Sequence, residues 1–372
     1  MKYLFSIFLA VIGLQVAAQC DPQATPETKG LFQNLLILQN MGIMFGHQDD
    51  LAYGNGWYNE PGRSDIKDVC GDYPGISGWE LGHLEQGNPY SLDSVYFSNI
   101  RKGIISFYNQ GGVNTVSWHG NNPLTGGSAW DVTSKEVVAS ILPGGSKHEL
   151  YVKYLDRLAD FFLSLKTEKG TYVPVLFRPY HEHTGSWFWW GKNLCTIEQY
   201  KELWRFTVTY LRDEKHIHHL LFCYSTDRFQ TQEEYLERYP GDDIIDMLAF
   251  DLYDRGPEYA GVLKNCAEIV SKLASEKGKP GAVSEAGGPI AQQTDWWTRL
   301  ILETLRPIPL SYVLVWRNPW QNPRDAFAPF KGHPSAPDFV KFYQDPHTLF
   351  LKEVSNARVY QVRYKVKSEK VK

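Results

Sequence analysis

The chain has 372 residues, enough for one large domain or two average ones, and its 43% hydrophobic content is ample for a large core. Its 38 Lys+Arg against 42 Asp+Glu give a formal net charge of −4, and no stretch of the body clusters basic residues as phosphate binding requires, so we expect no nucleic-acid partner. Aromatic residues make up 14% of the chain, more than a core needs, which indicates a groove that stacks flat or ring-shaped ligands.

The first twenty residues have the pattern of a secretory signal. One early lysine precedes an apolar run from Tyr3 to Val16, and small residues end that run. The run is too short to span a bilayer, and no later segment is long and apolar enough to do so. We therefore expect residues 1–18 to be a signal peptide and the protein to be exported, either to the periplasm or out of the cell. Cys20 leaves a lipid anchor open, although Gln19 before it is larger than lipoprotein signals favour.

Eight short apolar runs with strand character recur along the rest of the chain. They cover residues 41–47, 75–80, 113–119, 172–182, 219–225, 244–253, 280–287 and 311–318. Amphipathic stretches with helical spacing lie between them, the clearest at residues 147–166 and 196–214. Continuous apolar strands that alternate with helices predict a parallel sheet covered on both faces, and eight strands predict closure into an α/β fold of the (β/α)8 TIM-barrel type. No Pro/Ser-rich linker divides the body, so we expect one catalytic domain over residues 19–372 with a short basic C-terminal tail.

Polar and aromatic residues gather at the C-terminal ends of seven of these runs, which is where barrels of this type place their function. The ends are residues 47–49, 79–80, 118–119, 181–182, 251–253, 284–285 and 316–318. Two carboxylates stand out, Glu182 at the end of the fourth run and Glu285 at the end of the seventh. A pair of carboxylic acids that flanks one bond is the minimum equipment for glycoside hydrolysis, because one protonates the departing oxygen while the other attacks or supports the anomeric carbon. Tryptophans beside Glu182 would give stacking surfaces for sugar rings: Trp187, Trp189 and Trp190. One of the three must face inward, because alternate residues of an extended segment point opposite ways, and this leaves the direction of Trp189 open.

A catalytic metal is not expected. The "HEH" segment at residues 181–183 offers three ligand side chains, but it lacks the HExxH spacing that puts two imidazoles on one helical face. We expect no metal and no cofactor. The cysteines after Cys20 form no CxxC pair, which leaves buried thiols or a single disulfide as the alternatives.

Four segments carry a resemblance to a known family. They are "RPYHEHTGSWFWWG" at residues 178–191, "FGHQDDLAYG" at 45–54, "VSEAG" at 283–287 and "VWRN" at 315–318. With them the chain resembles glycoside hydrolase family 26, whose best-known members are β-mannanases, over essentially its whole length after the signal peptide. The resemblance implies a (β/α)8 barrel and hydrolysis with retention through a covalent intermediate. It further implies that Glu182 is the general acid/base and Glu285 the nucleophile.

The same resemblance implies roles for further residues. Tyr253 would hydrogen-bond the nucleophile, Trp187 would stack on the leaving-side sugar, and Trp316 and Arg317 would line the non-leaving side. The expected substrate contacts are His119, His181, Trp187, Tyr253, Trp316, Arg317, Trp118 and Trp190. We expect Arg178 and Asp251 to support the site. The family more often has "HEMNG" where this chain has "HEHTG", so we assign His183 no catalytic role.

The expected activity is that of a retaining endo-β-1,4-mannanase acting on mannan, galactomannan or glucomannan oligosaccharides as a monomer. His119 and His181 are placed to meet the axial C2 hydroxyl of mannose. A mixed-linkage β-1,3-1,4-glucanase is the first alternative, and a non-catalytic polysaccharide-binding barrel is the second. Long segments at residues 48–74 and 318–337 could wall the groove at its non-leaving end, so internal cutting and release of disaccharide from chain ends both stay open.

Overall fold

The computed structural model describes residues 19–363, so the predicted signal peptide and nearly all of the basic tail lie outside the described residues. Eight parallel strands form a closed barrel, since the last of them pairs with the first. These strands are β1 (Ile43–Gln48), β4 (Ile76–Glu80), β5 (Val113–Trp118), β6 (Val175–Pro179), β7 (Leu220–Thr226), β8 (Met247–Tyr253), β9 (Gly281–Gly287) and β10 (Tyr312–Val315). The predicted (β/α)8 barrel is confirmed, and each strand lies within or almost within one of the eight apolar runs.

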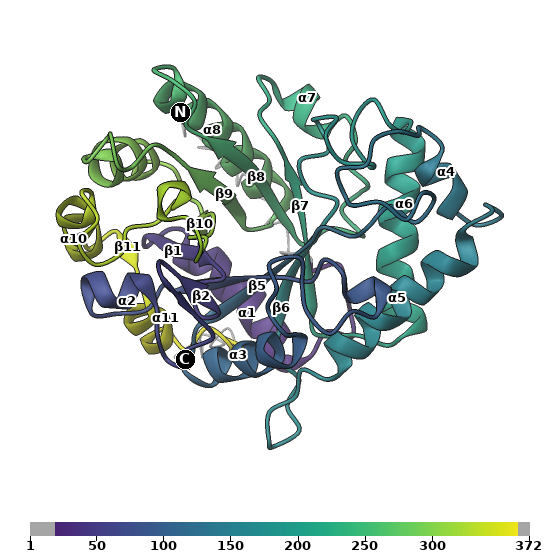
Figure 1. Ribbon diagram of the computed structural model, residues 1–372, viewed down its shortest axis with the longest axis horizontal. Helices are drawn as coiled ribbons and strands as arrows, with labels where there is room; N and C mark the ends of the chain where they lie inside the picture. Colours follow the sequence, from purple (N-terminus) through teal and green to yellow (C-terminus); the bar gives the residue numbers. More distant parts are fainter. Residues whose placement is uncertain (1–18, 364–372) are drawn as a thin grey trace, which may run out of the picture.

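Helices surround the strands, as Figure 1 shows. The longer ones are α1 (Pro26–Leu38), α3 (Phe97–Asn109), α5 (His148–Leu163), α6 (Ile197–Thr209), α8 (Tyr259–Lys277) and α10 (Ala336–Gln344). Shorter ones are α2 (Asp65–Cys70), α4 (Val137–Ile141), α7 (Gln232–Leu236), α9 (Glu303–Leu305) and α11 (Leu351–Asn356), with π-helical turns at Tyr210–Glu214 and Trp296–Leu302 and 3-10 turns at Leu84–Gln86 and Pro323–Asp325. The hairpin of β2 (Tyr53–Gly54) and β3 (Trp57–Tyr58) follows β1, and β11 (Thr348–Leu349) pairs with β1. Within residues 19–363 no helix combines the length and apolar character needed to cross a bilayer.

Local sequence explains where the helices begin and end. Thr196 caps α6 in a capping box, because its side chain accepts from the backbone of Gln199 while the Gln199 side chain accepts from the backbone of Thr196. Thr25 caps α1, and Pro26 occupies the first helical position, where its missing N–H costs nothing. The C-terminal end of α8 is capped by Gly278, whose φ of +64° suits glycine.

Neighbouring residues of each strand face two different cores. On β1, Met44 joins the cluster inside the barrel, while Phe45 packs outward against Phe339 and Phe350. The inner cluster also holds residues from the other strands and from α1: Ile76, Val113, Leu176, Leu221, Met247, Ala282, Tyr312, Leu31, Phe32 and Leu35. Because α1 packs its apolar side chains onto this cluster, the N-terminal end of the barrel is filled.

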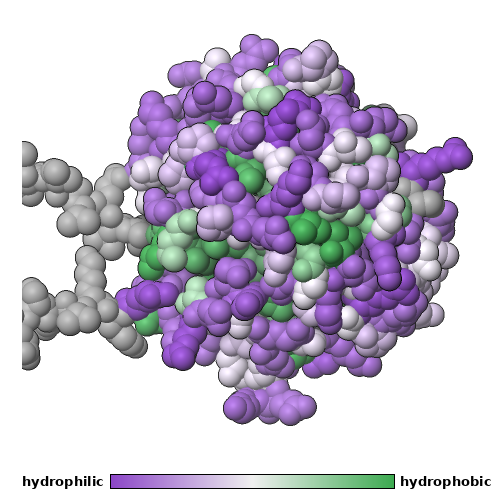
Figure 2. All heavy atoms as spheres, turned by 90° about the vertical axis from the view of Figure 1, so that its left-hand side faces the viewer, coloured by the Kyte–Doolittle hydropathy of each residue, from purple (hydrophilic) through white to green (hydrophobic). Residues whose placement is uncertain are grey.

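The face of the molecule that carries α10 is mostly hydrophilic (Figure 2). The larger hydrophobic patches of this face lie across its middle, and smaller ones are scattered elsewhere (Figure 2). The five cysteines all lie within the described residues and are unbridged, which fits the alternative of separate thiols: Cys20, Cys70, Cys195, Cys223 and Cys266.

Candidate active site

A strained turn after β6 places Glu182. The sequence prediction that the fourth strand continues to Glu182 is wrong, because Pro179 has no N–H with which to extend the sheet and the strand ends there. Tyr180 and Glu182 each have a φ of +52°, a left-handed conformation that is uncommon for residues other than glycine. The turn is held from behind: the N–H of Glu182 donates to the carbonyl of Ser225 at 3.2 Å, and the buried Tyr180 hydroxyl lies 2.7 Å from the hydroxyl of Thr207.

A bulge in β9 places Glu285. The register with β8 runs from Phe250 opposite Val283 to Asp251 opposite Glu285, so that Ser284 is an extra residue. The Ser284 hydroxyl donates to Asp251 at 2.7 Å. Ser284 and Glu285 are consecutive, yet both hydrogen-bond to side chains of β8, Ser284 to Asp251 and Glu285 to Tyr253. In a regular strand, consecutive side chains point to opposite faces and could not both do so. The bulge therefore turns Glu285 toward the barrel axis.

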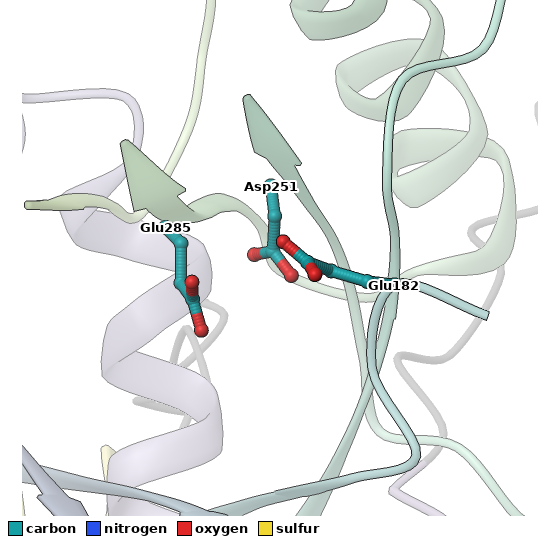
Figure 3. Close-up of side chains that lie close together, drawn as sticks. All are labelled: Glu182, Asp251 and Glu285. Atoms are coloured by element: carbon teal, nitrogen blue, oxygen red, sulfur yellow. The ribbon is translucent and has the colours of Figure 1, made fainter. Parts of the chain in front are cut away.

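Three carboxylates converge at the C-terminal rim of the barrel. One oxygen each from Glu182, Asp251 and Glu285 lies within 4.8 Å of the other two, and Figure 3 shows the side chains pointing toward a common space from the turn, from β8 and from β9. Arg178, on β6, donates to Asp251 at 2.9 Å and also to Glu285. Tyr253 donates its hydroxyl to the second oxygen of Glu285 at 2.8 Å. Glu285 is thus held from two sides, by the pair of residues that the sequence assigned to its surroundings.

The two glutamates stand in different electrostatic surroundings. Burial raises the pKa of Glu182 well above its usual range, and the negative charges of Glu285 and Asp251 raise it further. The indole N–H of Trp187 donates to Glu182 at 2.7 Å and offsets part of this effect. Burial also raises the pKa of Asp251 to about 7, against the opposing effect of Arg178. The surroundings of Glu182 therefore favour its protonated form, whereas Glu285 has a guanidinium and a phenol as donors to its carboxylate.

A chain of polar side chains leads from β4 to Glu285. Glu80 lies 2.8 Å from the Nδ1 of His119, and the Nε2 atoms of His119 and His181 are 3.0 Å apart. The Nε2 of His181 lies 3.9 Å from Glu285. Glu80 was recognised in the sequence only as one of the strand-end residues, without a role. Its position at the end of a strand was the available signal.

In this series of polar side chains, the charge is concentrated in the pair of Glu80 and His119. Burial by itself would raise the pKa of Glu80, but the charge and hydrogen bonds of His119 outweigh it and lower that pKa to about 2. Burial by itself would lower the pKa of His119. The charge and hydrogen bond of Glu80 outweigh this effect, so the pKa of His119 is raised. The pKa of His181 is lowered well below its usual range by burial and by Arg178, so His181 is neutral.

A pocket of about 580 Å³ opens over Glu182 and Glu285. Its walls are aromatic, and its rim carries both signs of charge: Trp130, Trp187, Phe188, Trp316, Phe327, Asp227, Arg228, Arg255 and Glu258. Trp187 and Trp130 keep 39% and 49% of their surface exposed, and Trp130 stacks on His119 with 5.2 Å between ring centroids. Trp130 and Phe327 were not predicted from the sequence, because both lie in loops well beyond the strands and carry no motif.

Two of the predicted substrate contacts, Trp118 and Trp190, do not line the pocket. Trp118 is 1% exposed and donates its indole N–H to Glu85, and Trp190 is fully buried and donates to the carbonyl of His181. Neither lines the pocket, because both indoles fill space behind it and support the turn that carries Glu182. Arg317 is half-buried, pairs with Asp93 at 3.1 Å and also does not line this pocket, whereas Trp316 does.

The "HEH" side chains do not converge. His183 is buried against Tyr200 and Tyr224, with ring centroids 4.4 and 4.9 Å away, and faces away from the pocket that Glu182 lines. Among residues 19–363, the three carboxylates of the site are close enough together to approach one cation. Arg178 already supplies positive charge to Asp251 and Glu285. The absence of a metal from the reaction stays a prediction.

Comparison with known proteins gives consistent matches. The family model of glycosyl hydrolase family 26 matches residues 20–321. A family 26 β-mannanase from Bacteroides ovatus has a similar structure, with a TM-score of 0.90 and 48% identity over 92% of this chain and 99% of that chain. The catalytic domain of an endo-β-1,4-mannanase from Bacillus sp. JAMB-750 has a TM-score of 0.85 and 32% identity over 92% of this chain and 96% of that one.

Among curated relatives, a mannan endo-1,4-β-mannosidase from Bifidobacterium adolescentis is 30% identical over 87% of this chain. The chain spans 34% of the length of that protein. It spans 59% of the length of a similar enzyme from Caldalkalibacillus mannanilyticus. A Bacillus subtilis mannan endo-1,4-β-mannosidase is 27% identical over 85% of this chain and 88% of its own length.

Proposed function

The chain belongs to glycosyl hydrolase family 26, and from this premise we propose that it is an endo-β-1,4-mannanase that cleaves mannan backbones with retention of configuration. The observation that carries the proposal is the short separation between Glu182 and Glu285, whose nearest oxygens lie within 4.8 Å. Retaining enzymes hold their two carboxyl groups roughly 5–5.5 Å apart, whereas inverting enzymes need about 6.5–9.5 Å to admit a water molecule. The spacing therefore favours direct attack by one carboxylate.

In the first step Glu285 attacks the anomeric carbon while Glu182 gives its proton to the departing oxygen. Arg178 and Tyr253 hold the Glu285 carboxylate in place for attack through the hydrogen bonds described above. The protonated state of Glu182 depends in part on the negative charge of Glu285, because that charge raises the pKa of Glu182. Forming the covalent bond removes the charge. The pKa of Glu182 then falls, and the same residue serves as the base that activates water in the second step.

The walls of the pocket suit a sugar chain. Trp187 lies beside the acid, so it is placed to stack on the sugar that leaves. Trp316 and His119, whose ring centroids are 6.0 Å apart, also line the pocket. Sugars present apolar CH faces to such rings and hydroxyl groups to the polar side chains around them. The rings of His119 and His181 line the pocket beside Glu182 and Glu285, next to the position of the reacting sugar.

Substrate and stereochemistry are tested together. Mannan leads because the relatives are named as mannan endo-1,4-β-mannosidases, and mixed-linkage glucan is the competing substrate. Reducing-sugar release should be much faster from galactomannan than from lichenan. Proton NMR of the first minutes of hydrolysis should show the β-anomer as the initial product. Faster hydrolysis of lichenan, or an initial α-anomer, would contradict the proposal.

We further propose that the protein is exported and that Cys20 has a structural role. The Cys20 thiol lies 3.1 Å from the buried carboxyl of Asp246, and its backbone N–H donates to the same side chain at 2.7 Å. These contacts fit a thiol that fixes the start of the domain. Mass spectrometry of the mature protein should find an unmodified chain that begins near Gln19, and a lipid on Cys20 would contradict this.

A further inference from the structure

A second cleft lined by aromatic rings lies outside the catalytic pocket. We name it the aromatic platform and define it by its lining residues, Tyr58, Tyr90, Ser94, Tyr96 and Trp320. Its volume is about 410 Å³. Three of its rings are among the most exposed large hydrophobic side chains of the described residues, with Tyr90 at 44%, Tyr96 at 50% and Trp320 at 38%. Exposed rings gathered in one cleft mark a binding surface more often than scattered ones do.

The platform lies at the functional rim of the barrel. Tyr58 belongs to the hairpin after β1, Tyr90 and Tyr96 belong to the loop after β4, and Trp320 follows β10. All three segments leave the C-terminal ends of their strands, as the catalytic loops do.

A short path connects the platform with the catalytic pocket. Trp316 lines the pocket, and the next residue, Arg317, pairs with Asp93, which directly precedes Ser94 of the platform. The ion pair thus joins the loop after β10 to the loop after β4 between the two clefts.

Contacts within the platform hold its rings in place without a ligand. The Tyr58 hydroxyl donates to the carbonyl of Ser94 at 2.6 Å, which ties the hairpin to the neighbouring loop. Tyr58 and Trp320 pack with 5.6 Å between ring centroids, and Tyr90 and Tyr96 pack edge to face at 6.2 Å. A surface that is ordered before binding loses less entropy when a ligand arrives.

The chemistry of the lining selects a neutral ligand with apolar faces and hydroxyl edges. The platform offers rings, phenol hydroxyls and one serine, with no carboxylate and no cation among its lining residues. Asp93, which directly precedes Ser94, is paired with Arg317. A charged peptide or a phosphate would find no partner here, whereas a pyranose chain would find stacking surfaces and hydrogen-bonding groups.

We propose that the aromatic platform is a second binding site for the polysaccharide substrate, which holds sugar units away from the bond that is cut. The proposal rests on the proposed function for the identity of the polysaccharide. Its consequence is a dependence on chain length: a polymer reaches both the pocket and the platform, whereas a short oligosaccharide is cut without using the platform.

The test compares long and short substrates in two platform variants, Tyr90→Ala/Tyr96→Ala and Trp320→Ala. Met41→Ala is the matched control, because Met41 is 63% exposed and precedes β1 at the opposite rim. Stacking of about 0.5–1.5 kcal/mol per ring corresponds to about two- to tenfold in affinity. KM for galactomannan should rise by about that factor in the platform variants, with unchanged kcat/KM for mannotetraose. Affinity electrophoresis in galactomannan gels, with Glu285→Ala added to each protein to prevent hydrolysis, should show the same loss of retardation.

The outcomes separate cleanly. Unchanged galactomannan binding in both platform variants would overturn the platform. An equal loss of kcat/KM on mannotetraose would also overturn it, because the substitutions would then act through the catalytic pocket. A wild-type dimer that Trp320→Ala dissociates in sedimentation also overturns it, since the rings would then be an interface between copies. If the wild type cuts neither mannotetraose nor galactomannan, the proposed function itself is refuted. The platform would still be supported in that case if the wild type binds the polymer and the platform variants bind it more weakly.

Discussion

The two ends of the barrel are built from the same strands and have opposite characters. On β6, Leu176 joins the inner apolar cluster, and two residues later Arg178 bonds to Asp251 and Glu285. On β8 the inward positions change from Ala249 to Asp251 over the same interval. The N-terminal half is packed and closed by α1, while the C-terminal half carries buried charges beneath an open pocket. The difference shows that stability and chemistry are separated along the barrel axis, so substitutions at the two ends should fail in different ways.

The largest expected effect is at the nucleophile. Glu285→Ala should lower kcat on galactomannan by on the order of 10⁴-fold or more, because removing a nucleophile abolishes the covalent route. Binding of polymer should survive, which distinguishes a catalyst from a non-catalytic binding barrel. Steady-state rates and affinity electrophoresis measure the two properties, and Glu233→Ala, an exposed acid on α7, is the control. Turnover that persists would refute the assignment of Glu285.

The acid should show a smaller effect that depends on pH. Glu182→Gln should lower kcat on galactomannan by about 10²- to 10⁴-fold, the usual contribution of general acid catalysis. An aryl mannoside with a good leaving group should suffer less, because its departure needs no proton. In the wild type the pKa of Glu182 is raised, so activity should fall as pH rises through that value and the acid form is lost. In Glu182→Gln this alkaline limb should be absent from the pH–rate profile, and an unchanged limb would assign it to another group.

At the closed end, damage should appear as instability. Leu176→Ala removes a fully buried side chain from the inner cluster and should lower the free energy of unfolding by about 2–5 kcal/mol. Arg178 lies only two residues away, yet kcat per folded molecule should stay within about twofold, because the cavity forms below the site. Urea unfolding and active-site titration give the two values. A loss of kcat as large as the loss of stability would show that the two ends are coupled.

The pair of Glu80 and His119 combines features of both ends of the barrel, since it is buried and also lies beside the catalytic site. The pKa of Glu80 is lowered from 4.5 to about 2, so its stabilising effect is present above pH 4.5 and is lost as pH falls toward 2. The pKa of His119 is raised, so its contribution is complete below its ordinary value near 6.5 and is lost as pH rises above it. Glu80→Gln should cost on the order of 1–3 kcal/mol at pH 5 and much less at pH 2. Thermal unfolding across this range measures the effect, and an equal cost at both pH values would show that lost packing is responsible.

Much of this molecule follows from local patterns. Eight apolar runs predicted eight strands, and the polar residues at their ends predicted the rim where the carboxylates meet. The failures have specific physical causes. The fourth strand stops at Pro179, since proline cannot donate to the sheet, and the Ser284 bulge has no signature in a run of alternating residues. Trp118 and Trp190 were placed in the groove because a tryptophan beside a catalytic residue looks the same in sequence whether it faces substrate or core.

By itself the sequence determined the barrel, the two glutamates and their family, because hydrophobic period, strand-end chemistry and the 178–191 motif are local properties of the chain. Tertiary structure alone decided which side chains share a space. Glu80, His119 and His181 come from three strand ends, and the aromatic platform draws on three separate loops. The physical reason is that charge pairing and ring stacking depend on distances of a few ångströms between residues far apart in the chain, and only the closed barrel sets those distances.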